Sequence, residues 1–245
     1  MSERSRPSIF WVLAGLVIPP LSCIVRFSIQ GGQKLPKTGA YVIAPNHFSE
    51  LDPVIVGAAL WKLGRVPRFL TKASLFKVPV VGWFLRRSGQ IPVQRSGSTR
   101  ENGPLKAAQA LARNGQIVII YPEGSLTRDP QLWPMRGKTG AVRMALEHDL
   151  PIIPVAHWGD QLVLGRYSKK ISLFPRRTVQ VAIGDPVDLS AFQERSRDSA
   201  TLNEATDLVM DEITALLESL RGEKAPGERW NPSMHDQKET GRFEG

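Results

Sequence analysis

The feature of this sequence that most limits its fold is an alternation of short β-rich runs with stretches of helical periodicity. Runs of Val, Ile and other apolar residues predict six strands, at 40–44, 68–72, 90–93, 116–121, 152–156 and 179–183. Between them, 53–63, 104–113 and 139–147 show a proline start, an Asn-Gly stop or apolar spacing typical of helices. Strands that alternate with crossover helices indicate an α/β domain.

The chain is long enough for one domain with short terminal extensions, at 245 residues with 42% hydrophobic content and no internal repeat. We predict a membrane-associated segment at 1–26, the main domain at 27–221 and a tail at 222–245. Thr201 and Glu204 stand in capping-box register at the start of the last helix. The tail is rich in Gly, Pro and charge, so we expect it to be disordered.

The charge of the chain is strongly positive, with 32 Lys and Arg against 23 Asp and Glu and a formal net charge of +9. A surface of this kind attracts polyanions, which leaves nucleic acid and anionic lipid as candidates. No recognition-helix signature or aromatic-basic interleaving favours nucleic acid, so we expect no nucleic-acid partner. The single Cys23 excludes an intramolecular disulfide, and no Cys/His spacing predicts a metal.

The strongest membrane signal is the uncharged run 9–25, which follows Arg4 and Arg6 and is closed by Arg26. As a helix it reaches about 25 Å, short of a hydrocarbon core of roughly 30 Å. We expect Pro19-Pro20 to break the helix near its end. The run therefore predicts a segment that dips into one leaflet, with a signal peptide or a buried core helix as alternatives.

A second apolar stretch, 76–85, ends in Arg86-Arg87. It fits equally a helix that lies on the bilayer beneath anchoring cations and an ordinary core helix.

Chemistry is suggested by His47 and Asp52, on the loop between the strand 40–44 and the helix 53–63. Five residues of ideal helix turn a side chain by about 500°, so helical geometry would hold the pair some 140° apart. If the loop folds back, the carboxylate of Asp52 accepts a hydrogen bond from one ring nitrogen of His47 and leaves the other to take a proton. The alternative is purely structural, with Asp52 as an N-cap before Pro53.

Four ordered segments decide between these readings. Asn46-His-Phe-Ser-Glu-Leu-Asp52 resembles the Asn-His-x-Ser-x-x-Asp block of the 1-acylglycerol-3-phosphate acyltransferase family. Gly89-Gln-Ile-Pro-Val-Gln-Arg95, Tyr121-Pro-Glu-Gly-Ser125 and Leu150-Pro-Ile-Ile-Pro-Val155 resemble its second, third and fourth blocks. The similarity covers about residues 27–190, and four motifs in order make a chance match improbable.

The resemblance implies an α/β fold with a central mixed sheet flanked by helices. It also implies an enzyme that moves a fatty acyl group from acyl-CoA or acyl carrier protein to lysophosphatidate, giving phosphatidate without metal or cofactor. His47 would be the general base and Asp52 its partner. Substrate contacts would come from the following residues: Asn46, Ser49, Lys72, Arg95, Glu123, Gly124, Ser125 and Arg128.

One departure from the family pattern concerns the acceptor. Family members usually carry arginine directly after the third block, where this chain has Leu126, so Arg128 or Lys138 is left as the nearest substitute. Another lysophospholipid or glycolipid acceptor is therefore an alternative, and a catalytically silent lipid-binding module is a further one. We expect membrane phospholipids as partners and a location on the cytoplasmic face of the cell membrane. We expect His157, after the fourth block, to be a buried structural residue.

Overall fold

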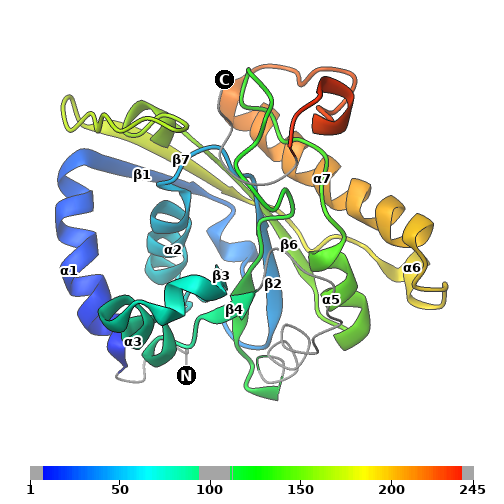
Figure 1. The fold of residues 1–245 in the computed structure, drawn as a ribbon, viewed down its shortest axis with the longest axis horizontal. Coiled ribbons are helices and arrows are strands. Elements are labelled where there is room, and N and C mark those ends of the chain that lie inside the picture. The colour runs from blue at the N-terminus through cyan, green and yellow to red at the C-terminus, as the bar shows by residue number, and fades with distance from the viewer. Residues whose placement is uncertain (1–7, 94–110, 112, 239–245) are drawn as a thin grey trace.

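A five-stranded mixed sheet forms the centre of the protein, in the order β1-β7-β6-β2-β5 (Figure 1). The computed structural model describes residues 8–93, 111 and 113–238. The strands are β1 (Val25–Gln30), β2 (Tyr41–Pro45), β5 (Ile117–Ile119), β6 (Ile152–Trp158) and β7 (Arg177–Ile183). All neighbours run parallel except β6 and β7, which are antiparallel. The α/β class and the mixed sheet are thus confirmed.

Helices cover both faces of this sheet. On one side lie α1 (Ile9–Ile24) and α2 (Asp52–Lys62), and on the other α5 (Gly140–His148) and α7 (Ser199–Arg221) (Figure 1). The side chains of β2 show why both layers are needed, since Val42 packs in the core beneath α5 and α7 while Ile43 packs in the core beneath α2. Successive residues of a strand point to opposite faces, so a strand covered on both sides is continuously apolar.

Smaller elements complete the fold. A separate two-stranded parallel sheet pairs β3 (Leu70–Lys72) with β4 (Ile91–Val93), and α3 (Pro79–Arg87) lies between them in sequence. The remaining helices are α6 (Ser190–Gln193), η2 (Gly32–Lys34), η3 (Ala73–Lys77), η4 (Asp160–Leu162) and η5 (Pro232–His235). All six predicted strands are found. Of the helix predicted at 104–113, only Leu111 and Arg113 lie among the described residues, and both are helical.

The N-terminal apolar run forms a longer and better anchored helix than we expected. The helix α1 continues through Pro19 and Pro20 to Ile24, so the predicted break is wrong. Leu21 and Val25 are buried in the core, and the amide of Val25 bonds to Leu21 O, which holds the last turn in place after the prolines. Among the described residues, no helix combines the length and apolar character needed to cross a bilayer.

The expected boundary after residue 26 falls inside β1, a strand that the sequence analysis missed. Every residue of β1 pairs with β7. Its sequence, VRFSIQ, mixes charged and apolar residues, as suits a strand at the edge of the sheet.

The last helix begins two residues earlier than the predicted capping box. Asp198 is its N-cap, and its carboxylate accepts a hydrogen bond from Thr201 N at 2.8 Å. Asp is as good an N-cap as Ser or Thr, and its position three residues before Thr201 gives the required geometry.

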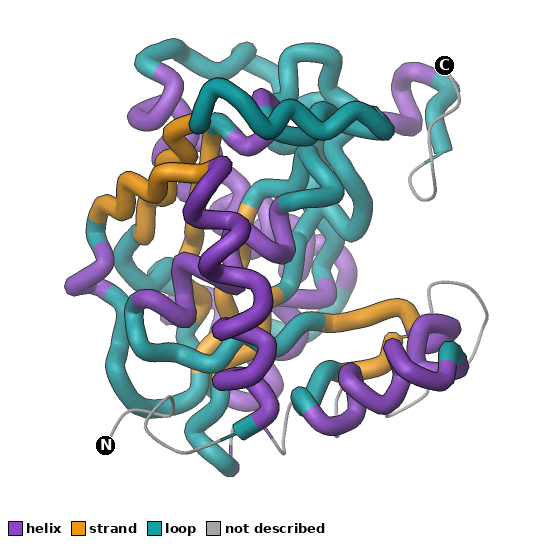
Figure 2. Tube along the Cα trace, turned by 90° about the vertical axis from the view of Figure 1, so that its left-hand side faces the viewer, coloured by secondary structure: helices purple, strands orange, loops and turns teal. Residues whose placement is uncertain are grey.

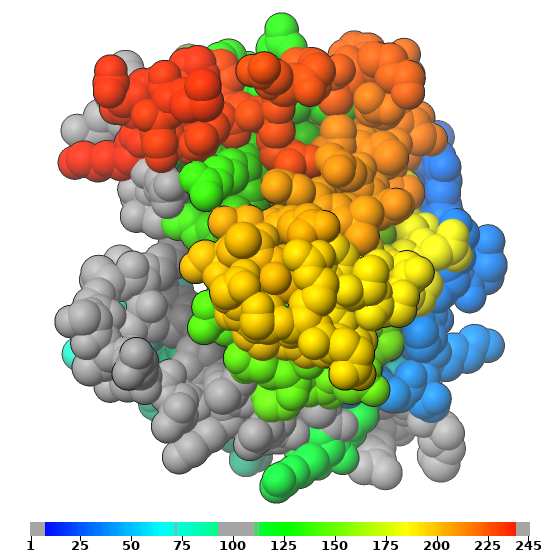
Figure 3. All heavy atoms as spheres, turned by 90° about the vertical axis from the view of Figure 1, so that its right-hand side faces the viewer, coloured from blue at the N-terminus to red at the C-terminus, as the bar shows by residue number. Residues whose placement is uncertain are grey.

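The segment after α7 is ordered up to residue 238, which corrects the prediction of a disordered tail. Arg229 forms salt bridges with Asp207 and Asp211 of α7, at 3.1 and 2.5 Å. Trp230 stacks on His235 and its carbonyl accepts a bond from Arg136 N. These contacts hold the segment against α7, and Figure 3 shows its red atoms beside the orange atoms of the helix. Residues 239–245 lie outside the described range.

The turn that ends β6 requires glycine. Gly159 has φ +111°, and a Cβ there would lie 2.4 Å from Thr178 O. We predict that Gly159→Ala lowers the free energy of unfolding by more than about 1 kcal/mol. Gly140→Ala is the control, since a Cβ at Gly140 meets nothing within 4 Å, and should stay within about 0.5 kcal/mol of wild type. Urea unfolding measures both, and equal midpoints would contradict the prediction.

Candidate active site

The loop between β2 and α2 brings His47 onto Asp52. His47 Nδ1 lies 2.8 Å from Asp52 Oδ2, which confirms the predicted hydrogen bond. The same oxygen accepts the backbone amides of Phe48 at 2.7 Å and Ser49 at 3.0 Å. Asp52 is fully buried. The loop therefore folds around one carboxylate oxygen, which fixes the imidazole in a single orientation.

The alternative that Asp52 is the N-cap of α2 is wrong. We expected an N-cap that accepts amides of the following helix, but Leu51 is the N-cap and Asp52 is the first residue of α2. Its side chain turns back toward the preceding loop because three donors converge on it there, including the imidazole. With Nδ1 bonded to Asp52, Nε2 is the ring nitrogen that can take a proton.

A second loop, 121–128, holds the backbone of His47 from the other side. His47 O accepts Thr127 N at 2.6 Å, and His47 N donates to Glu123 Oε1 at 2.8 Å. The other oxygen of Glu123 accepts Met135 N at 3.0 Å. Glu123 is fully buried, and this burial raises its pKa to about 8 against the lowering effect of the two amides. Glu123 thus positions the loop that carries the base.

Tyr121 is a neighbour of the base that the sequence analysis missed. Its ring stacks on the imidazole of His47 with centroids 4.1 Å apart and planes at 25°. Within the described residues its buried hydroxyl has no hydrogen-bond partner. Burial, with Asp52 and Asp160 as further causes, raises the pKa of Tyr121 well above its usual value, so the hydroxyl keeps its proton. The only sequence signal was its place at the start of the third block.

The polar residues of the first block bind the protein itself. The amide of Asn46 exchanges two hydrogen bonds with the backbone of His157, at 3.0 and 3.2 Å. Ser49 Oγ donates to Leu164 O at 2.7 Å. Both side chains are buried and fasten the loop to the segment at the end of β6. Their predicted contacts with substrate stay predictions.

The third block forms a turn whose charges point into the protein. Gly124 has φ +72° and its amide bonds to Tyr121 O, so the turn needs glycine. Ser125 and Leu126 are buried. Arg128 is also buried, where it donates to the hydroxyl of Tyr167 and, at 3.2 Å, to Lys238 O. A role for Arg128 in phosphate binding therefore stays a prediction.

Two predicted substrate residues cannot be placed at a site. Lys72 ends β3, and its side chain is outside the described part of the structure, as is all of Arg95.

An apolar cavity of about 660 Å³ opens beside the His47–Asp52 pair. His47 and Tyr121 lie in its wall, and the rest of the lining comes mainly from α1, α2, α3 and β3. Apolar members of this lining include Leu13, Val17, Val54, Trp61, Phe69 and Leu85. The volume lies in the range of small-molecule sites, and such a wall favours a hydrocarbon chain.

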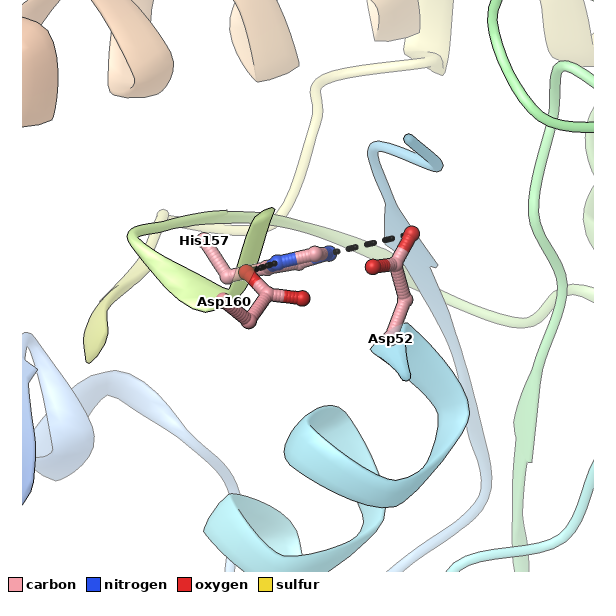
Figure 4. A group of neighbouring side chains, drawn as sticks. All are labelled: Asp52, His157 and Asp160. Atoms are coloured by element: carbon pink, nitrogen blue, oxygen red, sulfur yellow. Dashed lines mark hydrogen bonds and ion pairs between the residues drawn. The ribbon is translucent and has the colours of Figure 1, made fainter. Parts of the chain in front are cut away.

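Behind Asp52 lies a buried cluster with His157 and Asp160 (Figure 4). Among the described residues, these three form the one His/Asp group compact enough to hold a metal ion, with candidate ligand atoms within 4.8 Å of one another. Both ring nitrogens of His157 are already bonded to protein oxygens, to Asp160 Oδ1 and to Asn46 O at 3.0 Å each. A metal would have to displace these bonds, so a proton network describes the cluster better.

A family model described as Acyltransferase matches residues 26–158, more than half of the chain, and this range includes His47, Asp52 and Glu123. The chain belongs to this acyltransferase family. A chloroplastic 1-acyl-sn-glycerol-3-phosphate acyltransferase of Brassica napus is 29% identical over 73% of the chain and 51% of its own length. The corresponding enzyme of Borreliella burgdorferi is 24% identical over 80% of the chain and 74% of its length.

The chain spans about half the length of the chloroplast relatives that it matches. Its fold is similar to the crystal structure of the 1-acyl-sn-glycerophosphate acyltransferase PlsC from Thermotoga maritima. The TM-score is 0.64 at 22% identity, over 89% of this chain and 83% of the other.

The stacked ring of Tyr121 yields a first test of the acyltransferase site. We predict that Tyr121→Ala lowers kcat at least about tenfold, because the imidazole loses the surface that holds its plane. Tyr121→Phe keeps the ring and serves as the matched control, with kcat expected within about threefold of wild type. Steady-state acyl transfer measures both, and equal losses would show that the hydroxyl matters instead.

The raised pKa of Glu123 yields a second test. Between its unfolded value of 4.5 and about 8, the folded protein binds a proton at Glu123 that the unfolded chain does not. Its contribution to the free energy of unfolding is therefore largest below pH 4.5 and falls as pH rises to 8, on the order of 1 kcal/mol per unit. Urea unfolding across this range should show a shallower pH dependence for Glu123→Gln than for wild type. Parallel curves would contradict the assignment.

Proposed function

We propose that this protein transfers a fatty acyl group from acyl-CoA or acyl carrier protein to the sn-2 hydroxyl of 1-acylglycerol 3-phosphate, giving phosphatidate. The observation that carries the proposal is the oriented His47–Asp52 pair in the wall of a large apolar cavity. The acceptor class is that of the relatives, which are 1-acyl-sn-glycerol-3-phosphate acyltransferases.

The chemistry follows from the geometry of the pair. His47 Nε2 takes the proton of the acceptor hydroxyl while the hydroxyl oxygen attacks the thioester carbonyl. The Asp52 carboxylate, bonded to Nδ1, stabilises the imidazolium that forms. When the tetrahedral intermediate collapses, the C–S bond breaks and the sulfur leaves with the proton from His47. The acyl group moves directly from thioester to hydroxyl.

The cavity also supports a location at a membrane surface. Exposed apolar side chains gather on the two helices that contribute to its lining, with Trp11, Val12 and Leu16 on α1 and Val80, Val81 and Trp83 on α3. Arg86 and Arg87 follow in the last turn of α3. Apolar side chains with adjacent cations suit insertion at the depth of lipid headgroups. We propose that this face rests on one leaflet, and the cytoplasmic side stays a prediction.

Another lysophospholipid or glycolipid acceptor is the second candidate. It is favoured by the buried Leu126 in place of the usual arginine, and by the contacts that engage Arg128 with Tyr167 and Lys238. If the acceptor carries a phosphate, another cationic side chain would have to bind it.

The decisive experiment is acyl transfer by the purified protein in detergent, with palmitoyl-CoA and with palmitoyl-acyl carrier protein as donors. Lysophosphatidate and a panel of other lysolipids serve as acceptors. We expect phosphatidate from wild type, and losses in kcat of at least about 100-fold in His47→Ala and Asp52→Asn. Product only from another acceptor would move the substrate and keep the chemistry. No product from any pair would favour a silent lipid-binding module.

A further inference from the structure

Behind the catalytic pair, His157 occupies a position with unusual hydrogen-bonding demands. It is fully buried at the end of β6, and it faces Asp160 Oδ1 through Nδ1 and the carbonyl of Asn46 through Nε2. Asp52 Oδ2 lies 3.9 Å from the same Nε2 (Figure 4). A carbonyl oxygen only accepts, and so does an ionised carboxylate, so this geometry is satisfied when both ring nitrogens carry protons.

Two carboxyl groups beside His157 supply negative charge that an imidazolium would balance. Asp52 Oδ1 and Asp160 Oδ2 are buried and have no hydrogen-bond partner among the described residues. Two buried carboxylates repel each other, and one then takes up a proton unless a positive charge lies nearby. A protonated His157 supplies that charge from within the cluster.

We propose that His157 is a buried imidazolium and that, with Asp160, it acts as a positioning pair that keeps Asp52 ionised and aligned for His47. His157 also holds Asn46, the residue before His47. Its ring bonds to the Asn46 carbonyl, and its backbone exchanges two hydrogen bonds with the Asn46 side chain. The catalytic meaning of this inference rests on the proposed function, whereas the charge of His157 does not.

The electrostatics of the cluster show why Asp52 needs a positive charge beside it to stay ionised. Burial and the neighbouring Asp160 raise the pKa of Asp52 well above its usual value. Burial alone would also raise the pKa of Asp160, but the charge and hydrogen bond of His157 lower it. The titratable groups next to His157 are Asp52 of α2 and Asp160 of η4. Beyond them, His47 and Tyr121 lie on the far side of Asp52. The ring of Phe48 covers it at 4.8 Å.

The protonation state is tested without turnover. In ¹⁵N NMR of the ligand-free wild-type protein at pH 8, both ring nitrogens of His157 should carry the imidazolium signature, although an ordinary histidine with a pKa of about 6.5 is neutral there. A neutral ring at pH 8 would overturn the proposal, whatever the protein's activity.

A double-mutant cycle tests the catalytic role. His157→Gln should lower kcat about 10- to 100-fold with little change in KM, because Asp52 and Asp160 then share one proton. Asp160→Asn, added to His157→Gln, should restore kcat at least about tenfold, because it removes the second carboxylate. A merely structural role gives a double variant at least as impaired as His157→Gln, and that result overturns the proposal.

His148→Gln is the control, and thermal unfolding confirms that each variant is folded. An inactive wild type would count against the proposed function and leave the NMR result standing.

A second inference rests on a different part of the molecule, the loop 159–176 between β6 and β7. Four of its apolar side chains are exposed, with Phe174 at 78% and Ile171 at 60% the most open, beside Leu162 and Leu173. Isolated apolar residues on a surface are normal, but a cluster on one loop marks an interaction site.

The charge of the loop indicates its partner. From Gln161 to Ile183 the sequence holds five cations and no Asp or Glu; the cations are Arg166, Lys169, Lys170, Arg176 and Arg177. Exposed apolar tips flanked by cations suit a bilayer with anionic headgroups, where cations near the surface and buried apolar groups act together.

The loop lies on the same side of the molecule as α1. Arg176 Nη2 donates to Val25 O at the end of α1, at 3.2 Å. Figure 1 shows the loop extending above α1 at the left, and Figure 2, which looks onto that side, shows α1 running down the face. We propose that loop 159–176 is a membrane contact that binds anionic lipid through Ile171, Leu173 and Phe174 and the adjacent cations.

Vesicle co-sedimentation of the full chain tests this contact without any turnover. Wild type should bind vesicles of phosphatidylcholine with phosphatidylglycerol better than phosphatidylcholine alone. Phe174→Ser should weaken binding at least about threefold, and K169E/K170E should abolish the preference for phosphatidylglycerol. Met234→Ser removes an apolar side chain that is 75% exposed on another segment and should bind as wild type. Equal vesicle binding by the Phe174 and Met234 variants would overturn the proposal. It would also be overturned if the loop variants kept their vesicle binding and lost only RNA binding or self-association.

Discussion

One carboxylate oxygen organises the whole site. Asp52 Oδ2 collects the imidazole of His47 and two consecutive backbone amides, and it can do so only because the loop after β2 turns back on itself. The same contacts satisfy buried donors, which would otherwise cost free energy. The orientation of the His47 ring is thus a by-product of how the loop satisfies its own backbone. This explains why the pair can be five residues apart without lying on one helical face.

Around this oxygen, three chain segments are joined by side chains of the shared motifs. Glu123 ties the His47 loop to the segment around Met135, and Asn46 ties it to the end of β6. Several residues that a motif comparison would assign to the substrate therefore have a defined structural task. Such residues hold the base, which needs a placement finer than an ångström to be effective.

The sequence predicted six strands because apolar runs are local signals, and it predicted the His47–Asp52 contact because the block Asn46–Asp52 resembles a family motif. It failed where distant parts of the chain decide. Pro19 and Pro20 sit inside α1 because Leu21 and Val25 are held by core residues far away in sequence. The segment 222–238 is ordered through Arg229 and its partners on α7, and no local pattern reveals them. His157 was correctly expected to be buried, but its link to Asp52 depends on two strands becoming neighbours.

The reversed direction of β7 against β6 has a geometric consequence. Because β2 and β6 are parallel, their carboxyl ends lie at the same end of the sheet. His47 follows β2 there, and His157 is near the end of β6. A parallel continuation would have carried the chain back across a face of the sheet, whereas the antiparallel β7 lets it return at once. The connecting loop therefore stays at the edge where the base lies, and so does the end of α1, since β1 follows the direction of β7. A single change of strand direction thus gathers His47, its buried neighbours and the basic loop 159–176 at one rim of the sheet.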